Sequence, residues 1–189
     1  MRFITDFADL AVVLPIALCI GLALLGAGWR QGAAAWFLSI GATLATMLVL
    51  KLMFLGCGST HALSPSGHTA AGTVVYGGAA ALWLRRRMNV FLAALLAGAP
   101  VAILIGITRI AIHAHLPVEV AVGSVIGIGG IALMLRIAGA RPAMPDARKV
   151  LAVTVLIAVL LHGTRMDAEQ RLRHYAGWLP SGVCQQIIR

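Results

Sequence analysis

The chain has 189 residues, of which 60% are hydrophobic and 11% are charged, and its mean hydropathy is +0.95. Soluble domains carry about 25% charged residues, so this chain lacks the polar surface that a water-soluble fold needs. The composition excludes a disordered chain, a disulfide scaffold and an ordinary cytosolic enzyme, and it predicts one membrane-embedded domain over residues 1–189. The net charge of +9 lies in short basic runs between apolar segments, without interleaved aromatic residues. We therefore expect membrane lipids as partners and no nucleic acid.

Six apolar segments follow one another along the chain, at about residues 7–28, 32–55, 69–84, 90–107, 117–135 and 150–161. A helix that crosses a bilayer needs about 20 apolar residues. The sequence therefore predicts an all-α integral membrane protein, a bundle of six transmembrane helices. The third segment is equally compatible with a buried core helix, and the sixth is short. The first segment lacks the features of a cleaved signal and is expected to remain as a helix of the mature protein.

The last part of the chain, residues 164–189, has apolar side chains at helical spacing, among them Leu172, Tyr175 and Leu179. Trp178 is a residue type that favours the headgroup level of a membrane. This pattern predicts a helix on the membrane surface, with a disordered tail as the alternative.

The basic residues predict an orientation in the membrane. Eight Lys and Arg residues belong to the loops around Arg30, residues 85–87 and residues 136–149. The positive-inside rule places these loops in the cytoplasm. The loops at the other end then face the periplasm or the outside, and we expect a bacterial inner (plasma) membrane.

Several residues with charged or reactive side chains fall at the end of the bundle that is predicted to face outward. Ionisable groups at the ends of membrane spans are usually functional. They are Lys51, Ser66, Gly67, His68, Arg109, His115 and Glu119. Two of them, Lys51 and Arg109, supply positive charge, while Ser66 and the N–H of Gly67 supply neutral donors at the start of a helix. Such a set is suited to a tetrahedral phosphate.

Two histidines and a carboxylate complete this set. His68 and His115 can exchange protons near neutral pH. Glu119 lies four residues after His115 and can accept its N–H, which would fix the tautomer of the ring. A neutral, oriented imidazole is a competent nucleophile.

At these residues the chain resembles the type 2 phosphatidic acid phosphatase family, which is related to the vanadium haloperoxidases and bacterial acid phosphatases. The family has the motifs K-x6-R-P, P-S-G-H and S-R-x5-H-x3-D. The run from Pro65 to His68 matches the second motif, and Thr108-Arg109, His115 and Glu119 match the third in spacing. The resemblance covers about residues 51–127, which we take as the catalytic core.

The resemblance implies a metal-independent, cofactor-free reaction in which His115 forms a phosphohistidine. It further implies that Glu119 orients His115, that His68 protonates the leaving group and then activates water, and that the remaining four residues bind phosphate. The first motif departs from the family, because Gly58 and Ser59 stand where its arginine and proline would fall. His61, when protonated, is a possible auxiliary residue for that arginine.

The expected function is therefore an integral-membrane lipid phosphatase. Candidate substrates are a polyprenyl phosphate or diphosphate, phosphatidylglycerol phosphate, phosphatidic acid or a lipid A phosphate. A lipid phosphotransferase and a non-catalytic lipid-phosphate binding or transport protein remain as alternatives. In an oxidising compartment Cys57 and Cys184 could form a disulfide, and two unpaired thiols are the alternative.

Overall fold

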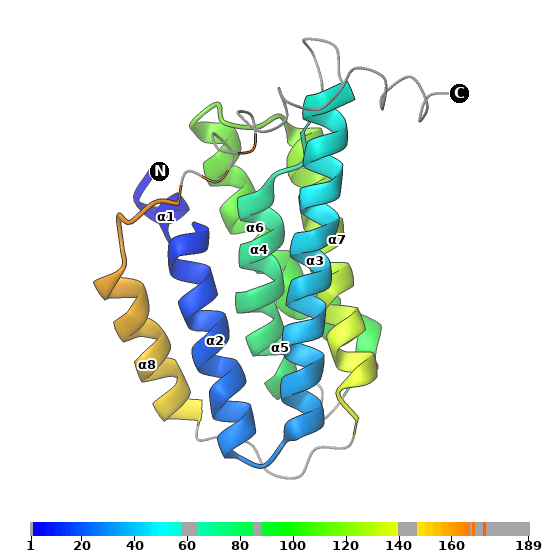
Figure 1. The fold of residues 1–189 in the computed structure, drawn as a ribbon, viewed down its shortest axis with the longest axis vertical. Coiled ribbons are helices and arrows are strands. Elements are labelled where there is room, and N and C mark those ends of the chain that lie inside the picture. The colour runs from blue at the N-terminus through cyan, green and yellow to red at the C-terminus, as the bar shows by residue number, and fades with distance from the viewer. Residues whose placement is uncertain are drawn as a thin grey trace.

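The computed structural model is helical over most of the part of the chain that it describes, which is residues 2–57, 64–84, 88–139, 147–166, 168 and 172. The elements are α1 (Arg2–Asp6), α2 (Leu10–Gly26), α3 (Arg30–Cys57), α4 (Gly67–Gly72), the π-helical η1 (Thr73–Gly77), α5 (Gly78–Leu84), α6 (Val90–Ala111), α7 (Pro117–Ile137) and α8 (Ala147–Leu160). The long helices run alternately up and down the bundle (Figure 1). Each of the six predicted segments coincides with a helix or a helical run, and the short helix α1 is an addition that the sequence did not predict.

The third predicted segment is the central helix of the bundle. Elements α4, η1 and α5 follow one another without a break and pack against α3, α6 and α7. All residues from Thr69 to Val75 are buried. This segment therefore has the character of a buried core helix, which was the alternative that the sequence left open.

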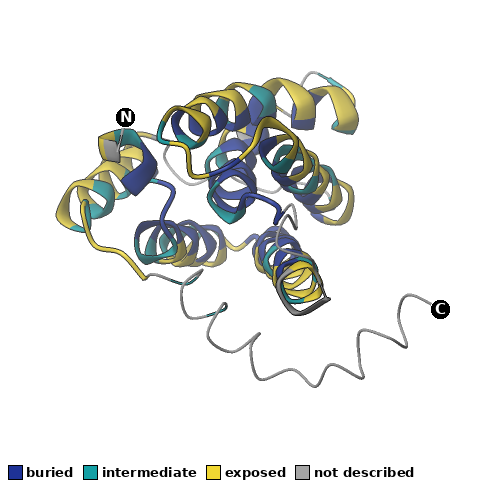
Figure 2. Ribbon diagram, turned by 90° about the horizontal axis from the view of Figure 1, so that it is seen from above, coloured by how far each residue is buried: buried dark blue, intermediate teal, exposed yellow. Residues whose placement is uncertain are grey.

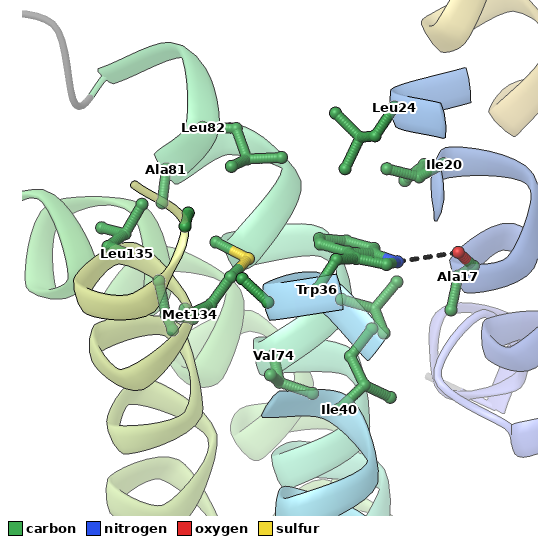
Figure 3. Close-up of a cluster of buried hydrophobic side chains, with 14 of the residues drawn as sticks. Ala17, Ile20, Leu24, Trp36, Ile40, Val74, Ala81, Leu82, Met134 and Leu135 are labelled. Atoms are coloured by element: carbon green, nitrogen blue, oxygen red, sulfur yellow. Dashed lines mark hydrogen bonds between the residues drawn. The ribbon is translucent and has the colours of Figure 1, made fainter. Parts of the chain in front are cut away.

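A tryptophan connects the central helix to its neighbours. Trp36 of α3 is fully buried, and its indole N–H donates to the carbonyl of Ala17 in α2 over 2.8 Å (Figure 3). Leu82 of α5 and Met134 of α7 lie in the same apolar cluster. A buried indole N–H without an acceptor would be costly, so this bond stabilises the packing of α2 against α3.

The outer surface of the bundle is apolar. Leu38, Ile103 and Val125 are 63%, 61% and 71% exposed, and exposed residues line the outside of the bundle (Figure 2). Three helices in the described part of the chain, α3, α6 and α7, are long and apolar enough to cross a membrane. Helix α2 is apolar but shorter, with 17 residues. These features indicate a membrane protein.

The candidate site residues and the basic residues of the predicted cytoplasmic loops lie at opposite ends of the bundle. The end of α3, the start of α4, the end of α6 and the start of α7 meet at one end. The described basic residues of the predicted cytoplasmic loops lie on helices at the other end, and they are Arg30, Arg136, Arg148 and Lys149.

Candidate active site

His115 and Glu119 are in direct contact through their side chains. The Nδ1–H of His115 donates to Oε2 of Glu119 over 2.9 Å, as the spacing of four residues predicts. The same oxygen accepts the backbone N–H of Leu116 over 2.9 Å, because Glu119 is the third residue of α7, which begins at Pro117. The carboxylate is therefore held by the start of its own helix. It fixes the proton of His115 on Nδ1 and leaves Nε2 as the basic nitrogen.

The neighbouring histidine, His113, differs from His115 in both exposure and backbone. His113 is exposed and has a φ of 55°, in the left-handed region, whereas His115 is 7% exposed. The turn at His113 follows the end of α6, where the N–H of Ala114 donates to the carbonyl of Arg109 over 3.0 Å. After this turn His115 is buried in the bundle while His113 stays exposed, which agrees with the motif spacing that selects His115.

The loop before α4 is attached directly to the start of α7. The backbone N–H of Ser66 donates to the carbonyl of Glu119 over 3.0 Å. The Oγ of Ser66 accepts the hydroxyl of Thr69 over 2.9 Å and caps α4, and the residue is fully buried. Its own hydroxyl hydrogen remains a possible donor. The two predicted motifs are thus brought together by a backbone contact.

Lys51 lies beside the same loop. The residue is 5% exposed, and its Nζ donates to the hydroxyl of Ser64 over 3.2 Å. A Cβ atom added to Gly67 would lie 3.3 Å from Cε of Lys51, so the lysine stem runs past the first turn of α4. A buried cation next to the N-terminal end of a helix is a combination that favours a bound anion.

Arg109 occupies the last turn of α6 and is partly buried. Its neighbour Thr108 is buried and accepts the hydroxyl of Thr5 over 2.9 Å, which joins α6 to the N-terminal helix α1. A guanidinium group at this end of α6 can bind two phosphate oxygens at once.

His68 contacts a carboxylate that the sequence analysis did not select. Its Nε2 lies 3.5 Å from Oδ2 of Asp9, at the long limit of a hydrogen bond, and the side chain of Asp9 is only 10% exposed. Asp9 precedes α2 and therefore lies at the same end of the bundle as the other site residues. A charged residue at the start of an apolar segment was the only signal in the sequence that could have pointed to it.

Burial raises the pKa of Asp9, but hydrogen bonding to His68 and to the N–H groups of Ala11 and Met166 outweighs this effect and lowers the pKa to about 2. Asp9 is therefore a carboxylate at any pH at which a phosphatase would work. Next to it, the side chain of Asp6 accepts three hydrogen bonds from Arg165, which tie the segment after α8 to helix α1.

Three candidate residues fall where the structure gives no description of the side chain. His61 and Cys184 lie outside the described residues, and the side chain of Cys57, at the end of α3, is likewise not described. The predicted helix over the tail also lies almost entirely outside them. Among the residues that are described, no three His, Cys, Asp or Glu side chains are grouped as metal ligands.

Comparison with known proteins supports the family to which these motifs point. The PAP2 superfamily model matches residues 55–143. The chain belongs to the PAP2 superfamily. This match contains His68, Arg109, His115 and Glu119, whereas Lys51 and Asp9 precede it. The superfamily indicates a phosphatase, that is, a hydrolase of phosphoric esters.

A similar protein found by sequence comparison has no assigned activity. The chain is 34% identical over 142 residues to an uncharacterized 22.5 kDa protein in the cps region of Klebsiella pneumoniae, and the match covers 71% of this chain and 67% of that protein. No solved structure matches the chain. The PAP2 motifs and their geometry are therefore the basis for any functional statement.

Proposed function

We propose that this PAP2 protein is an integral-membrane lipid phosphatase that acts through a phosphohistidine on His115. The observation that carries the proposal is the hydrogen bond between Nδ1 of His115 and Glu119. Because that bond keeps the proton on Nδ1, the lone pair on Nε2 is available to attack phosphorus.

The reaction has two steps. In the first, Nε2 of His115 forms a bond to phosphorus while the bond to the lipid oxygen breaks, and His68 gives a proton to that oxygen. In the second, His68 takes a proton from water, the water oxygen bonds to phosphorus, and the bond to His115 breaks. Glu119 stabilises the positive charge that His115 carries in the intermediate.

The phosphoryl oxygens are bound by Lys51, Arg109, Ser66 and the N–H of Gly67 in this proposal. Positive charge around the three equatorial oxygens is the main contribution to phosphoryl-transfer catalysis. The burial of Lys51 next to the first turn of α4 supports its role. His61 is proposed as an auxiliary cation in place of the arginine that the first motif lacks.

The proposed setting is a bacterial inner membrane with six spans and an active site that faces the periplasm. The alternation of the helices and the basic residues at the opposite end of the bundle support this orientation. The substrate would keep its acyl or prenyl chains in lipid and bring its phosphate to the bundle end. Polyprenyl phosphates or diphosphates, phosphatidylglycerol phosphate, phosphatidic acid and lipid A phosphates all meet this requirement.

The test is phosphate release by the purified protein from a panel of these lipids in mixed micelles, with a metal chelator present. Release from at least one lipid by the native protein, and none by the His115→Ala variant, is the expected result. Phosphate transfer to a second lipid without release would instead identify a phosphotransferase. Binding of a lipid phosphate without turnover would identify a non-catalytic lipid-phosphate binding or transport protein, the alternative that the absence of the first-motif arginine favours.

A further inference from the structure

The carboxylate of Asp9 has a different partner for each of its oxygens. Oδ1 accepts the backbone N–H of Ala11 over 2.9 Å and that of Met166 over 3.1 Å. Oδ2 is the oxygen that lies 3.5 Å from Nε2 of His68. The first two bonds come from backbone atoms of α2 and of the segment after α8, so they fix the orientation of the carboxylate. Capping α2 requires only Oδ1, which leaves the placement of Oδ2 unexplained by helix capping alone.

The two histidines of the site are therefore each paired with a carboxylate, but through opposite ring nitrogens. Glu119 contacts Nδ1 of His115, and Asp9 contacts Nε2 of His68. A carboxylate beside one nitrogen keeps a proton on it and determines that the other nitrogen exchanges protons with the substrate. For His115 this is Nε2, and for His68 it is Nδ1.

We propose that Asp9 is a positioning residue that orients His68 and holds its proton on Nε2, so that Nδ1 gives the proton to the leaving oxygen. This inference rests on the proposed phosphatase function. When the imidazolium of His68 has given up the Nδ1 proton, the neutral ring keeps the Nε2 proton directed at Asp9. The proton from the attacking water then returns to Nδ1. The Asp9 carboxylate stabilises the ring most strongly when the ring is positively charged, which is before the first proton transfer and after the second.

Asp9→Asn separates this role from helix capping. The amide oxygen of asparagine can still accept the N–H groups of Ala11 and Met166, so the start of α2 is preserved. The amide nitrogen would replace Oδ2 and present a donor to Nε2 of His68. Asp6→Asn is the matched control, because Asp6 lies in the same segment but its side chain binds Arg165.

The kinetic test compares two substrates that differ in their leaving group. An alkyl phosphate such as dodecyl phosphate needs a proton on its leaving oxygen, whereas 4-nitrophenyl phosphate does not. We expect Asp9→Asn to lower kcat/KM for the alkyl phosphate by about tenfold or more, and for the aryl phosphate by less than about twofold. Asp6→Asn should change both values in the same proportion. An equal loss for both substrates in Asp9→Asn, or no loss, would overturn the proposal.

A spectroscopic readout keeps the inference independent of activity. In protein labelled with ¹⁵N-histidine, the neutral ring of His68, identified by its absence in His68→Gln, should be protonated on Nε2 and should change to Nδ1 in Asp9→Asn. An unchanged His68 spectrum in Asp9→Asn would refute the pairing. If this tautomer change is seen while the native protein releases phosphate from neither of these substrates nor from any lipid of the panel, the proposed phosphatase function fails and the Asp9–His68 pair stands.

Discussion

The backbone N–H of Ser66 donates to the carbonyl of Glu119 over 3.0 Å, which joins the loop before α4 to the first turn of α7. Each residue is also held by its own helix, because Ser66 caps α4 and Glu119 accepts the N–H of Leu116. His68 follows Ser66 by two residues, and His115 precedes Glu119 by four. The bond therefore fixes the positions of the two histidines relative to each other. A reaction that needs two histidines in fixed positions around one phosphorus atom benefits from such a connection.

Gly123 permits this connection, and replacing it should disturb the site. A Cβ atom at Gly123 would lie 2.5 Å from the carbonyl oxygen of Ser66, a backbone atom that cannot move without the loop. We expect Gly123→Ala to destabilise the protein by about 1–3 kcal/mol and to reduce phosphatase activity.

Gly129→Ala is the control for this substitution. Gly129 lies on the same helix, is exposed, and has open space where a Cβ atom would be. Alanine there should be neutral or stabilising by up to about 1 kcal/mol. Thermal unfolding in detergent and phosphate release measure both variants. Equal stability of the two alanine variants would contradict the close contact between α7 and the loop.

Glu119 has two functions that different substitutions can separate. Glu119→Ala removes the acceptor of both His115 and Leu116, so it should lower stability by about 1 kcal/mol and also slow turnover. Glu119→Gln keeps an oxygen that can accept both bonds but loses the charge, and it should retain stability with reduced activity. Asp at this position is one methylene shorter and should be partly active. Activity of Glu119→Ala should still exceed that of His115→Ala. The reverse order would contradict the orienting role.

Asp9 should make stability depend on pH in the acid range. Its pKa falls from 3.8 to about 2 on folding, because hydrogen bonds to the carboxylate outweigh the effect of burial. The carboxylate therefore contributes its full stabilisation above about pH 4, and this contribution is lost as pH falls towards 2. The difference in unfolding temperature between native protein and Asp9→Asn, measured at about pH 5 and about pH 2.5, should shrink at the lower pH. A difference that is independent of pH would contradict a lowered pKa.

Much of the fold was predictable because the long helices coincide with apolar segments that have polar or glycine-containing boundaries. The boundary of α7 at Pro117 follows from the preference of proline for the first turn. The burial of the central helix was not predictable, since a segment of alanine, glycine and valine is equally suited to lipid and to a protein core. Its position follows from packing against α6 and α7, which only the structure displays.

For the site, the spacing of four residues between His115 and Glu119 predicted a contact that is present. The pairing of Asp9 with His68 was missed, because the two residues belong to different helices and a carboxylate before an apolar segment resembles an ordinary interfacial charge. Helix α1 was missed for a similar reason. It is stabilised by distant contacts, such as the one between Thr5 and Thr108, and no local pattern encodes them.

The most direct test of the central claim is to trap the phosphoenzyme. In His68→Gln, an aryl phosphate should still phosphorylate the protein, because its leaving group needs no proton, whereas hydrolysis of the intermediate should stall without a base to activate water. The protein is incubated with ³²P-labelled 4-nitrophenyl phosphate, quenched in alkali, in which phosphohistidine persists, and mapped by mass spectrometry. His113→Ala in the same background should be labelled equally, and His115→Ala should not be labelled. The account predicts a phosphoryl group on His115; label on His113, or no covalent label in a variant that still turns over, would contradict it.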